Sequence, residues 1–408
     1  MTAPIVLDEL DGQGQVVRLT SAQVDALTTC GLVDVRPETG GRWRLLPRAR
    51  VGAVRVDDLQ VQVTPKDKVG LTRLLFLLGY ARNPGFRPED VHGITEPDLW
   101  PALAESLARL AERATRGGVL QGYRTVEDSL RTVRGRIRIG DQMARRPGFV
   151  VPVEVTYDEF TSDIAENRIL RTALRRMLAI PGLSDSAAAR LAHIDGRLTE
   201  VAVLRRGEAI PRWQASRLNE RYQPALRLAE VILANASAEA GDGTVQVAGF
   251  VVDMAKVFED FVGTALTEAL RARPGTSQLQ YPDHLDSVGV GDKPVIHMFP
   301  DIVHTVGGRP RLIFDAKYKA EGPGGRYPNA DHYQMLAYAT TLRVPTAWLV
   351  YAGGGKPRVH RVRHTDVEIV EYPLDLRVSP HELLEQVDRL AQRAWTRATQ
   401  RAAGSSAA

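Results

Sequence analysis

The sequence predicts a protein of the α+β and α/β classes, with a β-rich N-terminal domain, a helical middle region and a C-terminal α/β unit. Short strand-like segments separated by turn residues come first, a stretch rich in Leu, Ala and Arg follows, and helix and strand patterns alternate at the end. A length of 408 residues suits two or three domains. The expected parts are residues 1–155, 156–245 and 246–400, followed by a disordered tail at 401–408.

The N-terminal part combines β-favouring residues with flanking Pro, Gly and Asp residues. This pattern predicts four strands, at Leu32–Val35, Arg42–Leu46, Val51–Val56 and Leu59–Val63, and one short helix at Ser21–Thr28. Two helices are expected next, at Leu71–Leu78 and Asp98–Arg116. The second carries leucines at helical spacing, namely Leu99, Leu103, Leu107 and Leu110.

An arginine-rich segment follows at Thr132–Ile139, before another expected strand at Val150–Tyr157. If the segment is a strand, Arg134, Arg136 and Arg138 share one face, because side chains alternate along a strand. This face could contact DNA phosphates, dock onto a partner protein, reach a nucleotide held by that partner, or simply be solvated.

The middle region from Ile164 to Ala236 is expected to form several helices, with breaks near Pro181 and Pro211. The segment Ser237–Thr244 is rich in Gly and small residues, so it is interpreted as a linker. After it the alternating pattern predicts a compact α/β unit over residues 246–400.

Composition excludes several classes of protein. Hydrophobic residues make up 44% and charged residues 25%, a globular balance, and the net charge of +4 is compatible with a polyanionic partner without demonstrating one. Cys30 is the only cysteine, so an internal disulfide and a multi-cysteine zinc site are excluded. No apolar run of about 18 residues and no signal-peptide pattern is found, so we expect no membrane contact and a cytoplasmic location.

The most informative stretch is Ile296–Lys319, which is interpreted as two strands joined by a tight turn at Gly307-Gly308. Asp301 lies on the first strand. The second is a buried run that ends in Asp315-Ala316-Lys317, so Asp315 and Lys317 point the same way. A hairpin brings Asp301 beside them.

Such a grouping suits phosphodiester hydrolysis. Two carboxylates at close range repel each other unless a cation lies between them, and oxygen ligands suit Mg²⁺, with Mn²⁺ as an alternative. A metal polarises the phosphate and lowers the pKa of a bound water, while a lysine stabilises developing negative charge. The pattern is that of a PD-(D/E)XK restriction-endonuclease-like domain.

Two further candidates lie on predicted helices. Glu259 falls inside the apolar stripe of the helix Val252–Leu270, so it is expected to have a partner, either the metal held by Asp301 and Asp315 or a helical arginine. Gln334 and Tyr338 lie one helical turn apart downstream and could face the site.

At this point the chain resembles a known family, McrC, the nuclease subunit of McrBC modification-dependent restriction systems. The resemblance covers roughly residues 40–350. Its motifs are Phe314–Lys319, Gln334–Tyr338, Tyr157–Thr161 leading to Glu166–Leu170, Arg134–Ile137 and Thr64–Lys66.

The resemblance implies a partner, a hexameric McrB-like AAA+ GTPase that the N-terminal part of the chain binds and stimulates. It also implies cleavage of double-stranded DNA that bears modified cytosine, and two-strand cleavage suggests pairing of two McrC copies. The sequence lacks a Gly-x-x-x-x-Gly-Lys-Ser/Thr phosphate loop, so GTP is expected on the partner and no nucleotide on this chain alone.

Other readings stay open at this stage. The chain could be a non-catalytic activator or bridge for the motor, or a stand-alone nuclease of repair or phage defence. His360 and His364 are interpreted as structural, because no third metal ligand lies near them in the sequence.

Overall fold

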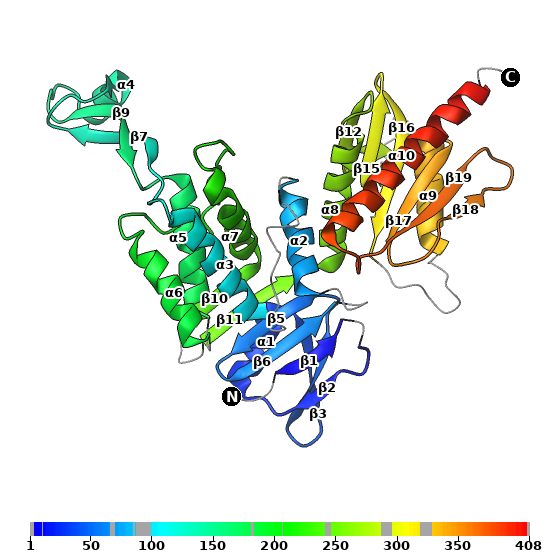
Figure 1. The fold of residues 1–408 in the computed structure, drawn as a ribbon, viewed down its shortest axis with the longest axis horizontal. Helices are drawn as coiled ribbons and strands as arrows, with labels where there is room; N and C mark the ends of the chain where they lie inside the picture. The colour runs from blue at the N-terminus through cyan, green and yellow to red at the C-terminus, as the bar shows by residue number, and fades with distance from the viewer. Residues whose placement is uncertain are drawn as a thin grey trace. The chain divides into compact units, whose positions relative to one another are not determined.

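The computed structural model describes residues 4–9, 11–65, 70–84, 86, 99–180, 183–205, 207–240, 246–286, 296–318 and 329–405. The chain divides into two compact units (Figure 1): unit 1 contains residues 1–95 and 249–408, and unit 2 contains residues 96–248. The expected boundary at 245 lies close to this division. The expected boundary at 155 instead falls within strand β9 (Val153–Thr161), inside unit 2.

The first sheet of the N-terminal segment also takes up strands from later in the chain. The order of this sheet is β1-β6-β5-β11-β10. The region expected to be a linker at Ser237–Thr244 therefore begins as strand β10, and β11 follows it. The strands are β1 (Ile5–Asp8), β5 (Val51–Val56), β6 (Leu59–Thr64), β10 (Ala236–Ala240) and β11 (Gln246–Val252).

A second, three-stranded sheet completes the N-terminal part, with the order β2-β4-β3. Its strands are β2 (Gln15–Val17), β3 (Val33–Glu38) and β4 (Arg42–Pro47). Helix α1 (Ser21–Cys30) begins with a capping box, in which Thr20 and Gln23 satisfy each other's backbone N–H groups. The four expected N-terminal strands and the short helix are confirmed.

Gly52 is fixed in β5 by a close backbone approach. Its φ is +146°, and a Cβ placed there would lie 1.8 Å from the carbonyl oxygen of Phe250 on β11. Only glycine allows the two strands to come this near without displacement.

The C-terminal part of unit 1 is a mixed six-stranded sheet with the order β12-β15-β16-β17-β19-β18. Strands β16, β17 and β19 are parallel neighbours, whereas β12, β15 and β18 are antiparallel to theirs. The strands are β12 (Thr276–Leu279), β15 (Ile302–Val306), β16 (Arg309–Lys317), β17 (Thr346–Ala352), β18 (Arg358–Arg361) and β19 (Glu368–Leu374). Strands β13 (Asp283–His284) and β14 (His297–Met298) pair separately.

Helices cover this sheet (Figure 1). Helices α8 (Met254–Leu270) and α10 (Pro380–Ser405) pack against each other and the sheet, and α2 (Leu71–Arg82) packs on α8. Helix α9 (Asn329–Thr341) buries Met335, Tyr338 and Ala339 in a core with Ile313, Leu349 and Ile369 of the strands. Alternation in β16 therefore turns the side chain of Ile313, and with it those of residues 315 and 317, toward the α9 face.

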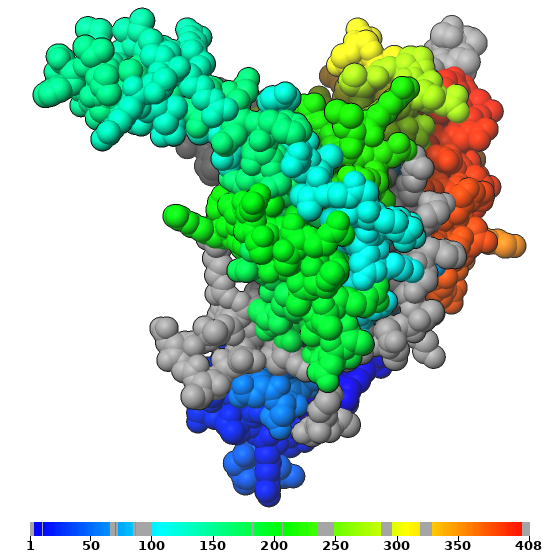
Figure 2. Space-filling view, turned by 60° about the vertical axis from the view of Figure 1, so that its left-hand side comes forward, coloured from blue at the N-terminus to red at the C-terminus, as the bar shows by residue number. Residues whose placement is uncertain are grey.

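Unit 2 combines a helical part with a small lobe. The helices are α3 (Leu99–Thr115), α5 (Ala165–Leu178), α6 (Asp185–Gly196) and α7 (Gln223–Asn235), with a 3₁₀ turn at Glu220–Tyr222. The lobe contains β7 (Gly122–Leu130), β8 (Arg136–Ile137), β9 and helix α4 (Ile139–Arg145), and Figure 2 shows its surface. Helices α5, α6 and α7 lie within the expected helical middle region, whereas parts of β9 and β10 occupy its two ends.

The expected disordered tail at 401–408 is wrong over residues 401–405, which continue helix α10 to Ser405. Alanine-rich sequence at this point favours helix, which the interpretation as a tail overlooked. Residues 406–408 lie outside the described part. Among the helices that the structure describes, none is long and apolar enough to cross a membrane.

We expect Gly52→Ala to destabilise unit 1 by about 1 to 3 kcal/mol, because its Cβ would overlap the Phe250 carbonyl. Urea denaturation followed by circular dichroism measures the change. Gly12→Ala is the control, since its Cβ meets nothing within 4 Å, and it should change stability by less than about 0.5 kcal/mol. Equal effects of the two substitutions would contradict the close approach.

Candidate active site

Strand β16 presents Asp315 and Lys317 at its carboxyl end. The buried run Leu312–Phe314 sets the strand in the sheet, and Asp315 is itself only 1% exposed. The Lys317 Nζ atom lies 2.5 Å from Asp315 Oδ2. A charge that is this deeply buried requires such a partner.

Asp301 comes directly before β15, and the β15–β16 hairpin places it beside them. Ile302 pairs with Phe314 in the antiparallel register, and the backbone N–H of Ala316 donates to Asp301 Oδ2 at 2.8 Å. The turn uses Gly307 and Gly308, whose φ values of +58° and +74° suit a two-residue hairpin turn. The structure thus brings Asp301, Asp315 and Lys317 together.

Glu259 of α8 lies near Asp301 in the same cluster. Asp253 caps this helix by accepting from the backbone N–H groups of Ala255 and Lys256, so Glu259 lies in the second turn. Its side chain is 28% exposed and lies 3.2 Å from Lys256 Nζ. Glu259 therefore lies at the border of the apolar face, and its partner on the helix is a lysine rather than an arginine.

Gln280 connects Glu259 to Asp301. Its amide nitrogen donates to Glu259 Oε1 at 2.8 Å and to Asp301 Oδ1 at 3.1 Å. Its backbone adopts a positive φ of +47° directly after β12, and its N–H donates to the Asp301 carbonyl. Sequence reasoning missed Gln280, because only the pairing of β12 with β15 brings it here.

Helix α9 adds polar groups on the face that covers β16. The Gln334 amide donates to the Tyr338 hydroxyl at 2.7 Å, and the Asp315 carboxylate contributes to the raised pKa of Tyr338, after the larger effect of burial. Asp331, also missed, is buried and accepts from the Tyr351 hydroxyl at 3.3 Å. Its charge acts on both Asp315 and Lys317.

The carboxylates of this cluster titrate unusually. Burial, with a further contribution from Asp315, raises the pKa of Asp301 to about 6. Burial and the Asp301 charge raise the pKa of Glu259, and burial raises that of Asp315 although Lys317 opposes the shift. For Lys317 burial lowers the pKa, but Asp315 and Asp301 together raise it overall.

The donor set fits a hard divalent cation. Asp301, Asp315 and Glu259 supply carboxylate oxygens from one strand, its hairpin partner and one helix. Oxygen ligands of this kind are those of Mg²⁺ and Mn²⁺. Burial and, after it, the charge of a neighbouring carboxylate raise the pKa values of Asp301 and Glu259, and a bound dication would offset both effects.

The arginine-rich segment does not form one continuous strand, so the single arginine face that a strand would give is absent among these residues. Only Arg136–Ile137 form a strand, β8, and helix α4 begins at Ile139. Gly135 at φ +72° packs its backbone against Thr156 and turns the chain, which prevents one continuous strand. Arg134 lies over the Tyr157 ring at 4.2 Å, and both Arg134 and Arg136 are exposed.

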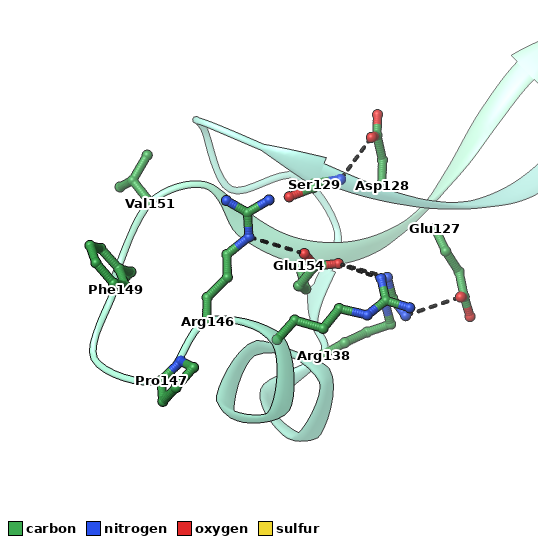
Figure 3. A pocket seen from close by; sticks show the side chains of 10 residues that line it. Glu127, Asp128, Ser129, Arg138, Arg146, Pro147, Phe149, Val151 and Glu154 are labelled. Atoms are coloured by element: carbon green, nitrogen blue, oxygen red, sulfur yellow. Dashed lines mark hydrogen bonds and ion pairs between the residues drawn. The ribbon is translucent and has the colours of Figure 1, made fainter.

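Arg138 does not belong to a free arginine face, because it forms ion pairs within the lobe (Figure 3). It bonds to Asp141, to Glu127 at 3.0 Å and to the buried Glu154 at 3.2 Å. Arg145 and Arg146 lie 3.4 and 3.5 Å from Glu154. The cavity beside them has a volume of about 750 Å³. Because Glu154 is only 3% exposed, Arg138 stabilises the lobe.

The chain belongs to the family of McrBC 5-methylcytosine restriction system components, whose sequence model matches residues 46–352, well over half of the chain. This confirms the family resemblance. No curated protein matches the chain.

Two solved structures are similar. One is a chain of the refined half-complex from the tetradecameric assembly of Thermococcus gammatolerans McrB AAA+ hexamers with bound McrC. It is 17% identical over 95% of this chain and 99% of its own, with a TM-score of 0.59, which shows that the fold is shared. The other comes from the cryo-EM structure of the Thermococcus gammatolerans McrBC complex, 20% identical over 67% of this chain and 90% of its own, with a TM-score of 0.41.

We expect metal binding at the carboxylate cluster to weaken as the pH falls through about 6, because protons then compete for Asp301. Mn²⁺ affinity, measured by electron paramagnetic resonance in the absence of DNA, should be at least about tenfold lower at pH 5 than at pH 7. Above pH 7 this group contributes no further change. An affinity that stays constant between pH 5 and pH 7 would contradict the raised pKa.

Proposed function

We propose that this chain is a Mg²⁺-dependent DNA endonuclease of the PD-(D/E)XK type. It would be the cleaving subunit of a GTPase-driven, modification-dependent restriction complex. The observation that carries the proposal is the cluster of Asp301, Asp315, Lys317 and Glu259, held by the Ala316 N–H and the Gln280 amide. Membership of the McrBC restriction family supports it independently.

The residues divide the work as follows. Asp301, Asp315 and Glu259 would hold the dication, which when bound would polarise the phosphate and lower the pKa of a bound water. Lys317, only 20% exposed, places its ammonium where negative charge develops on the phosphate oxygens. Gln334 and Tyr338 form a polar wall on the α9 side that orients the scissile strand.

The raised pKa values agree with this division. A metal ligand must be deprotonated, and the dication would restore the ionised form of Asp301 at neutral pH. Lys317 stays protonated because Asp315 and Asp301 raise its pKa. The ammonium therefore acts as a charge that stabilises rather than as a general base.

We further propose that the unit 2 lobe docks onto an McrB-like AAA+ GTPase hexamer. Large apolar side chains gather on this lobe in the open: Tyr123, Val133, Ile137, Ile139, Met143, Phe149, Val150, Val151 and Phe160 are all at least 40% exposed. Exposed apolar groups in such number are typical of an interaction surface. The similar solved chain comes from an assembly of McrB AAA+ hexamers with bound McrC.

The remaining parts of the proposal concern the other components. GTP would bind to the partner, and the substrate would be double-stranded DNA with modified cytosine in the cytoplasm, as expected for phage defence. Two copies of the chain would pair to cut both strands. Arg134 and Arg136 are exposed on the lobe and would contact the partner or DNA.

Asp315→Asn should reduce Mg²⁺-dependent cleavage of methylated DNA by roughly a hundredfold or more, because the metal loses a buried ligand. The assay combines the purified chain, an McrB-like AAA+ GTPase, GTP and Mg²⁺. GTPase stimulation in the same mixture should be unchanged and is the control. Undiminished cleavage by the Asp315→Asn chain would refute the site. If the wild-type chain itself does not cut the DNA, a non-catalytic bridging role would be favoured.

Replacing two lobe side chains by acids, in Met143→Asp with Phe149→Asp, should weaken binding to the AAA+ partner by more than about tenfold. Both side chains are about 70% exposed, so the fold should tolerate the change. The matched control is Leu218→Asp, which lies outside the lobe in the same unit and is 84% exposed. If the control weakens binding as much as the double variant, the lobe is not the docking surface.

A further inference from the structure

A cluster of two histidines and one glutamate lies where α9 meets the β18–β19 edge of the sheet. His332 Nε2 is 2.9 Å from Glu371 Oε1, and His360 Nε2 is 3.5 Å from the same oxygen. The ligand atoms of all three residues lie within 4.8 Å of one another, and the two imidazole rings meet edge to face at 5.2 Å.

Glu371 is the buried member of the cluster. It is 4% exposed, and its Oε2 atom has no hydrogen-bond donor among the described residues. The nearest charge is Arg358, whose Nη1 atom is 3.8 Å from Oε2 on a side chain that is 49% exposed. A buried carboxylate oxygen without a donor costs free energy unless another group satisfies it.

The three residues converge through the fold. On β18 and β19, His360 pairs with Ile369 and Arg358 pairs with Glu371, so His360 and Glu371 are diagonal neighbours on one face. His332 comes from the first turn of α9. His360 therefore has the third ligand that its sequence neighbourhood lacks.

From this geometry we propose that His332, His360 and Glu371 bind one transition-metal dication, Zn²⁺ foremost. Two imidazole nitrogens and one carboxylate are a typical zinc donor set, whereas Mg²⁺ prefers oxygen alone. Nitrogen ligands around a tetrahedral Zn²⁺ lie roughly 3.4 Å apart. Side-chain rotations that shift the ligand atoms by about 1 Å would therefore bring the three residues to zinc-binding distances. Glu371 Oε2 then gains its missing partner.

A fourth position remains for water. The cluster opens on a cavity of about 340 Å³, lined among others by Tyr333 and Leu336. The metal site would link the first turn of α9 to the edge strand β18, whose four residues are all exposed. The same helix carries Asp331, Gln334 and Tyr338, which neighbour Asp315, so the metal is a positioning element for that helix.

The site is tested with ZnCl₂ and the full-length chain carrying Asp315→Asn, so that the carboxylate cluster does not contribute. Isothermal titration calorimetry should find one Zn²⁺ per chain. His360→Asn or Glu371→Gln in that background should lower the Zn²⁺ affinity by more than roughly a hundredfold. Loss of a residue that only hydrogen-bonds a metal ligand costs up to about a hundredfold, and loss of the ligand itself should cost more. His364→Asn, an exposed histidine near β18, is the matched control and should bind like its parent.

Two further readouts keep the test decisive. Co²⁺ in place of Zn²⁺ should give the intense visible absorption of a tetrahedral site, and His360→Asn should abolish it. Arg358→Gln should tighten Zn²⁺ binding, because it removes a positive charge 3.8 Å from the ligand Glu371. Absence of Zn²⁺ binding would overturn the proposal. Equal binding by the His360→Asn and His364→Asn variants would also overturn it and would indicate an adventitious ion only.

This inference does not depend on nuclease activity. Cleavage can fail in the parent chain while Zn²⁺ still binds His332 and His360, and the reverse can also occur. The two proposals therefore stand or fall on separate measurements.

Discussion

The burial of three neighbouring carboxylates, Asp301, Asp315 and Glu259, is the constraint on which the candidate site depends. The ionised form of Asp301 is disfavoured in the folded chain, so folding free energy is lost as the pH rises from 3.8 to about 6, and the cost is constant above that. The hairpin register, the Ala316 N–H, the Gln280 amide and the Lys317 ammonium hold the cluster together against that cost. The packing of the buried strands and of α8 stabilises the fold and offsets the free-energy cost of the buried carboxylates.

How much of this was predictable depends on the range of each interaction. Asp315 and Lys317 follow from strand alternation, and Asp301 from a two-glycine turn, because both are local in sequence. Gln280 and Asp331 were not predictable, since separate elements bring them in through sheet pairing and helix packing. The same holds for His332, His360 and Glu371, which three elements contribute.

The arginine segment shows the opposite failure. Alternating Arg and Ile residues at 134–139 satisfy a strand pattern, yet Gly135 turns the chain and α4 begins at Ile139. Ile137 and Ile139, which would share the opposite face of a strand, are 40% and 67% exposed. Apolar residues that remain exposed are a property of the tertiary structure. They favour a docking function for the lobe that sequence periodicity alone did not reveal.

The central claim is that Asp301, Asp315 and Glu259 hold a catalytic dication. Anomalous diffraction from crystals soaked in Mn²⁺ tests it most directly, since Mn²⁺ replaces Mg²⁺ and can be located by its own scattering. The account predicts a peak bounded by the carboxylates of Asp301 and Asp315, about 2.2 Å from their oxygens, with Glu259 directly or through water. A site without such a peak, at Mn²⁺ concentrations that support cleavage, would contradict it.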